Sequence, residues 1–349
     1  MAAVVAGARG IQWIVSDLGA DTTAPAADPH GAAIRVVIPP GADASEIGAI
    51  LEDQGVVADG GRFREYAKDQ GEGSDFKAGA YTMRAGTGYD ALIRALDRGP
   101  VEVTKTLVIP EGYRITDIQA RLPAVGISKQ AYARAVRRAV PPPGYGHHLN
   151  MEGFMFPATY TIRPGEKAAA LVDQQLAAFQ ANVSKVDMSY AKSKNLTPYD
   201  VLTIASMIER EARAPGDRAK VAAVIYNRLH RGMALGIDAT ILYHLGSWSA
   251  TIHQSDIDQI EPYNTRKVAG LPPTPICNPG RDALMAVAHP ATSNALYFVA
   301  DGTGGHVFAA TLAEHQANVA RWRQIEAQRL AAERATVAQH QATPAAAHP

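Results

Sequence analysis

The sequence predicts an α+β protein: a small α/β unit, then a larger and mainly helical unit that carries a short β-hairpin. Three observations support this prediction. A strand–turn–helix pattern occurs twice before residue 126, apolar residues recur at helical spacing from Thr197 to Arg231, and two β-rich runs flank a glycine-rich turn at 301–305. A chain of 349 residues is long enough for two such domains.

Composition narrows the classes of function. The hydrophobic share of 47% and the charged share of 19% are typical of a folded globular protein. Lys plus Arg and Asp plus Glu number 34 each, so a nucleic-acid partner has no electrostatic support. The single cysteine, Cys277, excludes an intramolecular disulfide, and we expect a structural thiol.

The first unit is built on a repeated pattern. The segment from Ile34 predicts a strand, a V-I-P-x-G turn and a helix from about Ala44, and the same order recurs from Lys105. A strand at Phe76–Met83 and a helix at Tyr89–Arg98 lie between the copies. We assign residues 34–125 to this unit.

The next segment supplies no metal site. Ser128 is expected to cap a helix that ends near Val140, and a proline-rich loop with His147 and His148 follows. No H-E-x-x-H or similar ligand spacing accompanies this pair, nor any of the other histidines, so we predict no bound metal. Alternating aromatic residues after Glu152 then predict a strand or extended edge.

Two helices at the centre of the chain end beside a pair of carboxylates. Thr197 is the expected N-cap of the first helix, whose apolar residues from Val201 to Ile208 share one buried face. That helix ends in Glu209 and Glu211, and a second helix stops at Gly232.

A partly buried carboxyl group at this place could act as a general acid, because burial raises its pKa and lets it hold a proton near neutral pH. Glu209 and Glu211 lie on opposite flanks of the apolar face, so the helical wheel does not choose between them. The alternative is that both are solvated residues at a helix end.

The last part of the chain alternates loops with short elements. Asp238 is expected to cap a short helix that ends at Gly246, and a hairpin is expected at 297–309. Thr311 and Glu314 form a capping box for a long last helix. We expect residues 326–349 to be a disordered tail.

Five segments of the sequence help to decide between these alternatives, because they resemble a known family. In chain order they are EGFMFPATYTI, ASMIERE, VIYNRL, YNTRKVAGLPPTPICNPG and YFVADGTGGHVFAATLAEH. Together they closely resemble the endolytic murein transglycosylase family (MltG/YceG-like), and the resemblance covers roughly Ile34 to Arg323. It implies a YceG-like catalytic domain at 126–325 and a LysM-like subdomain at 34–125. The family's catalytic glutamate is the second in its E-x-E segment, which is Glu211 here.

The resemblance implies a lytic transglycosylase that needs no cofactor. One glutamate protonates the β-1,4 glycosidic oxygen and then takes the proton of the muramic C6 hydroxyl, which closes a 1,6-anhydro ring. Substrate-binding candidates are Asn227, Asp238, Thr240, Tyr263, Asn264, Glu152 and His306. Each of them has a purely structural alternative, such as capping or a buried hydrogen bond. Gly236 stands where the family commonly has Gln, which puts one polar contact in doubt.

The resemblance also implies a place of action. Family members cut nascent peptidoglycan strands outside the bacterial inner membrane, beside peptidoglycan synthases, and a single N-terminal helix anchors them. Here Arg9 and Gly10 interrupt the apolar start, which is shorter than the roughly 20 residues that span a bilayer. We read residues 1–33 as a truncated or atypical anchor and a linker, with a soluble form as the alternative.

Two other functions stay open at this point. A lysozyme-like hydrolase would need a second acidic residue or an activated water near Glu211. A non-catalytic peptidoglycan-binding protein would need no acid at all.

Overall fold

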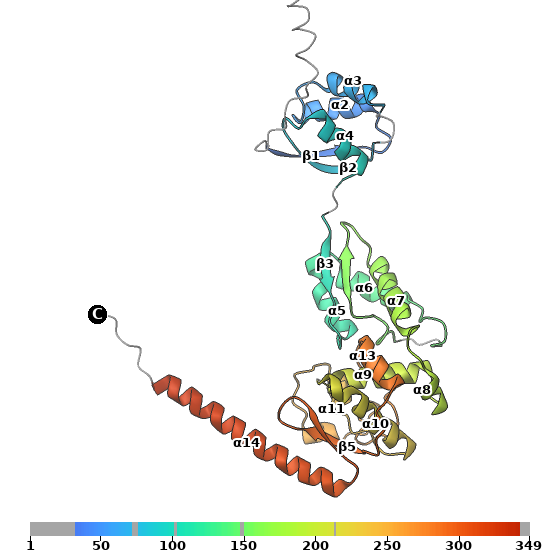
Figure 1. Cartoon of the computed structure of the whole chain (residues 1–349), viewed down its shortest axis with the longest axis vertical. Helices are drawn as coiled ribbons and strands as arrows, with labels where there is room; N and C mark the ends of the chain where they lie inside the picture. Colours follow the sequence, from blue (N-terminus) through green and yellow to red (C-terminus); the bar gives the residue numbers. More distant parts are fainter. Residues whose placement is uncertain (1–31, 72–75, 101–102, 147–149, 213, 343–349) are drawn as a thin grey trace, which may run out of the picture. The chain divides into compact units, whose positions relative to one another are not determined.

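The computed structural model describes residues 32–342, apart from residues 72–75, 101–102, 147–149 and 213. The chain divides into two compact units, Met1–Val103 and Thr104–Pro349. Both combine helices with antiparallel two-stranded sheets, which confirms the α+β class (Figure 1). The expected anchor, the pair His147 and His148, and the last residues of the tail lie outside the described residues.

In the N-terminal unit, two helices follow the first strand along the chain, and the second strand then pairs with the first. Its elements are β1 (Ala33–Ile38), α2 (Ala44–Asp53), α3 (Gly60–Asp69), β2 (Gly79–Arg84) and α4 (Tyr89–Arg98). β1 and β2 are antiparallel, with Ala33 opposite Arg84. One face of the strands and the inner faces of the helices bury a single apolar core. Asp43 starts α2 with a capping box, which fixes the turn after β1.

Two glycines let α2 and α3 approach each other closely. A Cβ atom at Gly48 would stand 2.4 Å from the carbonyl oxygen of Gly60, and a Cβ at Gly60 would stand 2.2 Å from that of Gly48. Neither distance is possible between real atoms. The packing of this unit therefore requires glycine at both positions.

The boundary between the units differs from the one expected after residue 125. β3 (Lys105–Val108) pairs antiparallel with β4 (Thr159–Ile162), and α5 (Ile115–Arg121) follows β3 within the larger unit. The second strand–turn–helix copy forms as expected, but its strand pairs with β4, about 50 residues further along the chain in the larger unit. Local sequence does not reveal that partner, because strand pairing is a long-range contact.

The rest of the larger unit is mainly helical. Its other elements up to residue 288 are η1 (Leu122–Val125), α6 (Lys129–Arg138), α7 (Ala168–Val183), α8 (Ser189–Ser193), α9 (Pro198–Glu211), η2 (Pro215–Asp217), α10 (Arg218–His230), α11 (Asp238–His244), α12 (Gln254–Asp258) and α13 (Arg281–Ala288).

Helix α9 is the centre of this unit. The Thr197 hydroxyl accepts the backbone N–H of Asp200, and the Asp200 carboxylate accepts that of Thr197, so the expected cap is confirmed. Every residue from Val201 to Ile208 is buried, and the helix packs against α10, α11 and α13. The apolar part of α9 is thus enclosed, and its charged end is left at Glu209–Glu211.

A buried asparagine ties the loops around α9 together. The Asn278 side-chain oxygen accepts the backbone N–H groups of Gly153 (3.0 Å) and Met155 (2.8 Å). Its amide nitrogen donates to the carbonyl of Tyr113 (2.7 Å) and to the Glu152 carboxylate (3.0 Å). All four bonds join segments far apart in sequence, so this residue fixes the scaffold on which the site is built.

The C-terminal part begins with the expected hairpin, β5 (Tyr297–Ala300) paired with β6 (His306–Ala309). α14 (Leu312–Ala342) then starts against these strands and continues as one helix, so the expected disorder from residue 326 is not found up to Ala342. Its Ala, Gln, Glu and Arg residues are good helix formers. Within the described residues, we find no helix with the length and apolarity to cross a bilayer.

Gly48→Ala should destabilise the N-terminal unit by about 1–3 kcal/mol, because the added methyl group overlaps the backbone of α3. Gly61→Ala is the matched control on α3, since its Cβ would meet only the Asp59 side chain, at 3.2 Å. Hydrogen exchange of the α2 and α3 amides in the full chain measures both. Equal protection in the two variants would contradict the close-packing account.

Candidate active site

The two carboxylates at the end of α9 point to different places. The Glu209 carboxylate accepts the backbone N–H of Gly280 at 3.0 Å, at the start of α13. Glu211 instead lines a cavity of about 460 Å³. Of the two carboxylates, Glu211 is the one that lines a cavity found in the described part of the chain, and its catalytic role stays a prediction.

The cavity is lined by five parts of the larger unit together with Arg228 of α10. The end of α9 and the loop before α11 form one side, and the Arg266 loop, the hairpin and the first turns of α14 form the rest. Its lining residues are Glu211, Arg228, Leu235, Gly236, Asp238, Arg266, Phe298, Val299, Ala300, His306, His315, Val319 and Trp322. The lining combines two carboxyl groups, cationic side chains and aromatic rings, a mixture suited to a polar ligand with apolar faces.

Burial raises the pKa of Glu211 to about 7, and the nearby carboxylate of Asp238 acts in the same direction. The backbone N–H of Ala239 and the guanidinium groups of Arg266 and Arg210 oppose this shift. Glu211 is therefore poised to hold a proton near neutral pH and to release it, which is what general acid–base chemistry requires.

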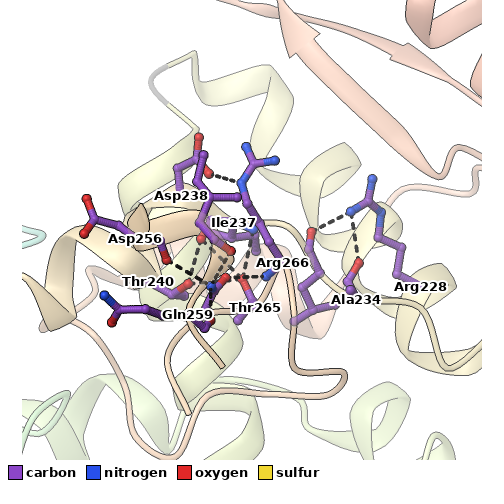
Figure 2. A network of polar contacts seen from close by, with 12 residues as sticks. Arg228, Ala234, Ile237, Asp238, Thr240, Asp256, Gln259, Thr265 and Arg266 are labelled. Carbon is purple, nitrogen blue, oxygen red and sulfur yellow. Dashed lines mark hydrogen bonds and ion pairs between the residues drawn. The ribbon is translucent and has the colours of Figure 1, made fainter. Parts of the chain in front are cut away.

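An ion pair stands beside this carboxyl group. The Arg266 Nε atom donates to Asp238 Oδ1 at 2.6 Å (Figure 2). Asp238 is the first residue of α11, and Ile237 occupies the N-cap position, so Asp238 does not cap the helix as expected. The pair presents its two opposite charges to Glu211, and each shifts the pKa of Glu211 in its own direction.

Thr240 and Asn264 are not among the residues that line the cavity. Thr240 is fully buried, and its hydroxyl donates to the carbonyl of Ile237 at 2.7 Å. The amide nitrogen of buried Asn264 donates to the backbone carbonyls of Asp256 and Ile257 in α12 and of Gln259 just after it (Asp256 and Gln259 are labelled in Figure 2). Both side chains are used to hold the loops that carry Asp238 and Arg266.

Three other candidates lie away from Glu211. The Asn227 amide donates to the carbonyls of Ser293 and Ala295, and the residue lines a separate cavity of about 730 Å³. Tyr263 shares a hydrogen bond with Thr274 at 2.9 Å. The structure places neither of them in the Glu211 cavity, because these bonds direct their side chains to the scaffold.

Glu152, the last of these candidates, is buried at 4% exposure. Its carboxylate accepts the backbone N–H of Ile115 at 3.0 Å in addition to the Asn278 amide. Burial raises the pKa of Glu152 to about 8, against the opposing effects of the Ile115 bond and Arg114. This carboxyl group therefore belongs to the scaffold around Asn278.

The chain matches known proteins over most of its length. Residues 36–321 match the model of the YceG-like family. The chain belongs to the YceG-like family. A putative YceG-like protein from Listeria monocytogenes has a crystal structure that matches with a TM-score of 0.55 and 31% identity, over 81% of this chain and 98% of that one.

Relatives in the YceG-like family carry a functional name. A protein of Streptococcus pneumoniae strain D39 named endolytic murein transglycosylase is 35% identical over 320 residues, which cover 82% of this chain. The match spans only 58% of the length of that relative. A Bacillus subtilis protein of the same name is 30% identical over 298 residues, with 81% of this chain and 82% of the relative covered.

Arg228 and Arg266 were missed as site residues by the sequence analysis. Arg228 donates to the backbone carbonyls of Leu296, Ala234 and Leu235, and so joins the hairpin to the loop before α11. Both arginines stand inside segments that resemble the family, VIYNRL and YNTRKVAG, which is the signal that could have marked them. Gly236 also lines the cavity, and a Cβ there would stand 3.1 Å from Arg228 Nη1.

Among the described residues of this YceG-like chain, no group of three or more His, Cys, Asp or Glu side chains is arranged to hold a metal ion. Cys277 is buried, and burial raises the pKa of its thiol well above the usual value. A thiolate nucleophile is therefore disfavoured at this position. The chemistry of the cavity rests on its carboxyl, guanidinium and imidazole groups.

Glu211→Gln should make the protein more stable at neutral pH. Because the pKa of Glu211 in the folded state, about 7, exceeds its ordinary value, its contribution to the free energy of unfolding is full below about pH 4.5 and is lost as pH rises to about 7. A glutamine does not ionise. The advantage of the variant over wild type should therefore grow by about 1–3 kcal/mol across this window.

Urea unfolding of wild type and variant at about pH 5, 6, 7 and 8 measures this difference. The titration of Glu152 is common to both proteins and cancels. A difference that stays constant with pH would contradict the raised pKa of Glu211.

Proposed function

We propose that this protein is an endolytic peptidoglycan lytic transglycosylase that cuts the β-1,4 bond between N-acetylmuramic acid and N-acetylglucosamine in nascent strands, and so limits strand elongation. The observation that carries the proposal is Glu211, a carboxyl group with a pKa of about 7 in a cavity of a YceG-like chain. The shared name of the relatives, endolytic murein transglycosylase, supports the same reaction.

In this mechanism Glu211 serves first as acid and then as base. Protonated Glu211 gives its proton to the glycosidic oxygen, and the bond between that oxygen and C1 of the muramic residue breaks. The resulting carboxylate takes the proton of the C6 hydroxyl of the same residue, whose oxygen bonds to C1. The product ends in a 1,6-anhydro ring, no water is consumed, and Glu211 regains its proton.

The ion pair beside Glu211 has a role in both steps. As positive charge develops at C1, the carboxylate of Asp238 offers compensation from the cavity wall. Arg266 holds that carboxylate at 2.6 Å and stabilises the ionised form of Glu211 between the two steps. Among the substrate-binding candidates, Asp238 and His306 are the ones supported by their place in the cavity.

Glycoside hydrolysis is a second candidate function, and the observation that favours it is Asp238. It supplies a second carboxylate in the same cavity, as a two-carboxylate hydrolase requires. Its ion pair with Arg266 lowers its availability as a nucleophile or base. The two reactions differ in product, since hydrolysis leaves a reducing muramic end.

We further infer that the N-terminal unit is a LysM-like subdomain that contacts glycan strands. Its compact strand–helix–helix–strand order supports this role. Membership of the YceG-like family is the ground for two further proposals. We propose an inner-membrane location with the catalytic unit outside, and peptidoglycan synthases as partners.

Glu211→Gln should reduce strand cleavage by about 100-fold to 10,000-fold, the usual contribution of a general acid. Glu209→Gln is the matched control two residues away, and should keep most of the activity because a glutamine can still accept the Gly280 N–H. Mass spectrometry of digested, uncrosslinked peptidoglycan reads both rate and product. Anhydro-muramic ends made by wild type support the proposal, and reducing ends favour the hydrolase.

No cleavage by wild type, with strands still bound, would instead indicate a non-catalytic binding protein. Nearly full activity of Glu211→Gln would remove this residue from the mechanism.

Charge changes beside Glu211 should move the alkaline limb of the pH–rate profile in opposite directions. Asp238→Asn removes a charge that raises the pKa of Glu211, so the acid should lose its proton at lower pH. Arg266→Gln removes a charge that lowers this pKa, so activity should persist to higher pH. We expect shifts of about half a unit to one unit. Shifts of both variants in the same direction would contradict the assignment of Glu211 as the titrating acid.

A further inference from the structure

Asp217 and His306 form a pair at the edge of the Glu211 cavity. Asp217 immediately precedes α10 and is buried, with 9% of its side chain exposed. Its Oδ2 atom accepts the backbone N–H of His306 at 2.7 Å and lies 3.2 Å from the ring Nδ1 atom. A carboxylate oxygen only accepts hydrogen bonds, so this contact requires the proton of the imidazole to be on Nδ1.

The other ring nitrogen of His306 is left as an acceptor. Phe298 stands edge-on to the ring at 5.2 Å and 89°, and Phe308 lies 6.3 Å away. These contacts hold the ring in place, and only 12% of the side chain is exposed. Nε2 meets no hydrogen-bonding group within the described part of the chain. In its neutral form the ring thus offers one lone pair, at Nε2, in a fixed direction.

His306 also stands where two cavities meet. It lines the Glu211 cavity and a neighbouring one of about 600 Å³. The second cavity lies between the start of α10 and the turn of the hairpin, and its other lining residues are Ala214, Asp217, Lys220, Asp301, Thr303, Gly304 and Gly305. A polymer that is cut internally must extend beyond the reacting bond on both sides, so a ligand leaving the Glu211 cavity this way would pass His306.

We propose that His306 positions the glycan strand at this junction, by accepting a hydrogen bond from a sugar hydroxyl at Nε2, and that Asp217 acts through His306 by fixing its tautomer. This inference rests on the proposed function, since it takes a glycan as the ligand. Its strength is that one buried carboxylate explains both the orientation of the ring and the location of its proton. Neither residue transfers a proton in the reaction.

The competing account is that His306 only fastens β6 to the start of α10. In that case the bond from Nδ1 to Asp217 would matter, and Nε2 would not. Two substitutions separate these accounts, because an asparagine side chain places a polar group near Nδ1 and a glutamine side chain places one near Nε2. The glutamine carbonyl can accept the sugar hydroxyl, whereas the asparagine amide reaches only Asp217.

The test measures binding of purified, uncrosslinked peptidoglycan strands to full-length protein in the Glu211→Gln background, where strands stay intact. We expect His306→Asn to weaken binding about fivefold to tenfold, as loss of one hydrogen bond predicts, and His306→Gln to weaken it less. Nitrogen-15 NMR of the imidazole in otherwise wild-type protein, assigned by its absence in His306→Asn, should show the proton on Nδ1. Asp217→Ala removes the acceptor from Nδ1, so the proton should no longer be held there and should shift toward Nε2.

Weaker binding by His306→Gln than by His306→Asn would overturn the proposal in favour of the fastening role. So would a wild-type proton on Nε2, or a lack of strand binding by the Glu211→Gln protein. Cleavage by wild type is scored separately, and failure of cleavage with the expected binding order would overturn the proposed reaction and leave the positioning role standing.

Discussion

Burial of α9 is the constraint on which the rest of the larger unit depends. Its apolar residues are enclosed by α10, α11 and α13, and Glu209 to Glu211 form the half-buried C-terminal end of the helix. The C-terminus of a helix disfavours an ionised carboxylate, while the N-terminus of a helix favours one. Glu211 stands at the end of α9 and beside the Ala239 N–H at the start of α11. The fold thus supplies opposing effects on its proton before any charged neighbour is considered.

Charged neighbours then refine this balance. Asp238 raises the pKa of Glu211 and Arg266 lowers it. The two side chains also bind each other, so together they add little net charge beside the Glu211 carboxyl group. The loops that carry the pair are held by Thr240, Asn264 and Thr265, whose side chains bond to backbone and to one another. The buried polar residues of this region therefore act on the site by fixing geometry, and the half-exposed ones act on it by charge.

Helix α9 could be predicted from sequence because its signals are local: the N-cap residue Thr197 and the apolar periodicity that follows it. Glu211 was chosen through the resemblance of the E-x-E segment to the family, and its catalytic role stays a prediction. The roles of Asn227, Asn264 and Glu152 could not, because a polar side chain reads the same whether it bonds to backbone or to a ligand. Only the fold shows that their bonding groups contact distant segments. The domain boundary was missed for the same reason, since β3 pairs with the distant strand β4.

The central claim is that Glu211 holds a proton near neutral pH in the folded protein. A carbon-13 NMR titration of the side-chain carboxyl groups in glutamate-labelled protein, with Glu211 assigned by the loss of its signal in Glu211→Gln, tests this directly. We expect a midpoint at about pH 7, set by burial and by Asp238. A midpoint near the ordinary glutamate value of about 4.3 would contradict the account, because the residue would then be an ionised group with no proton to give.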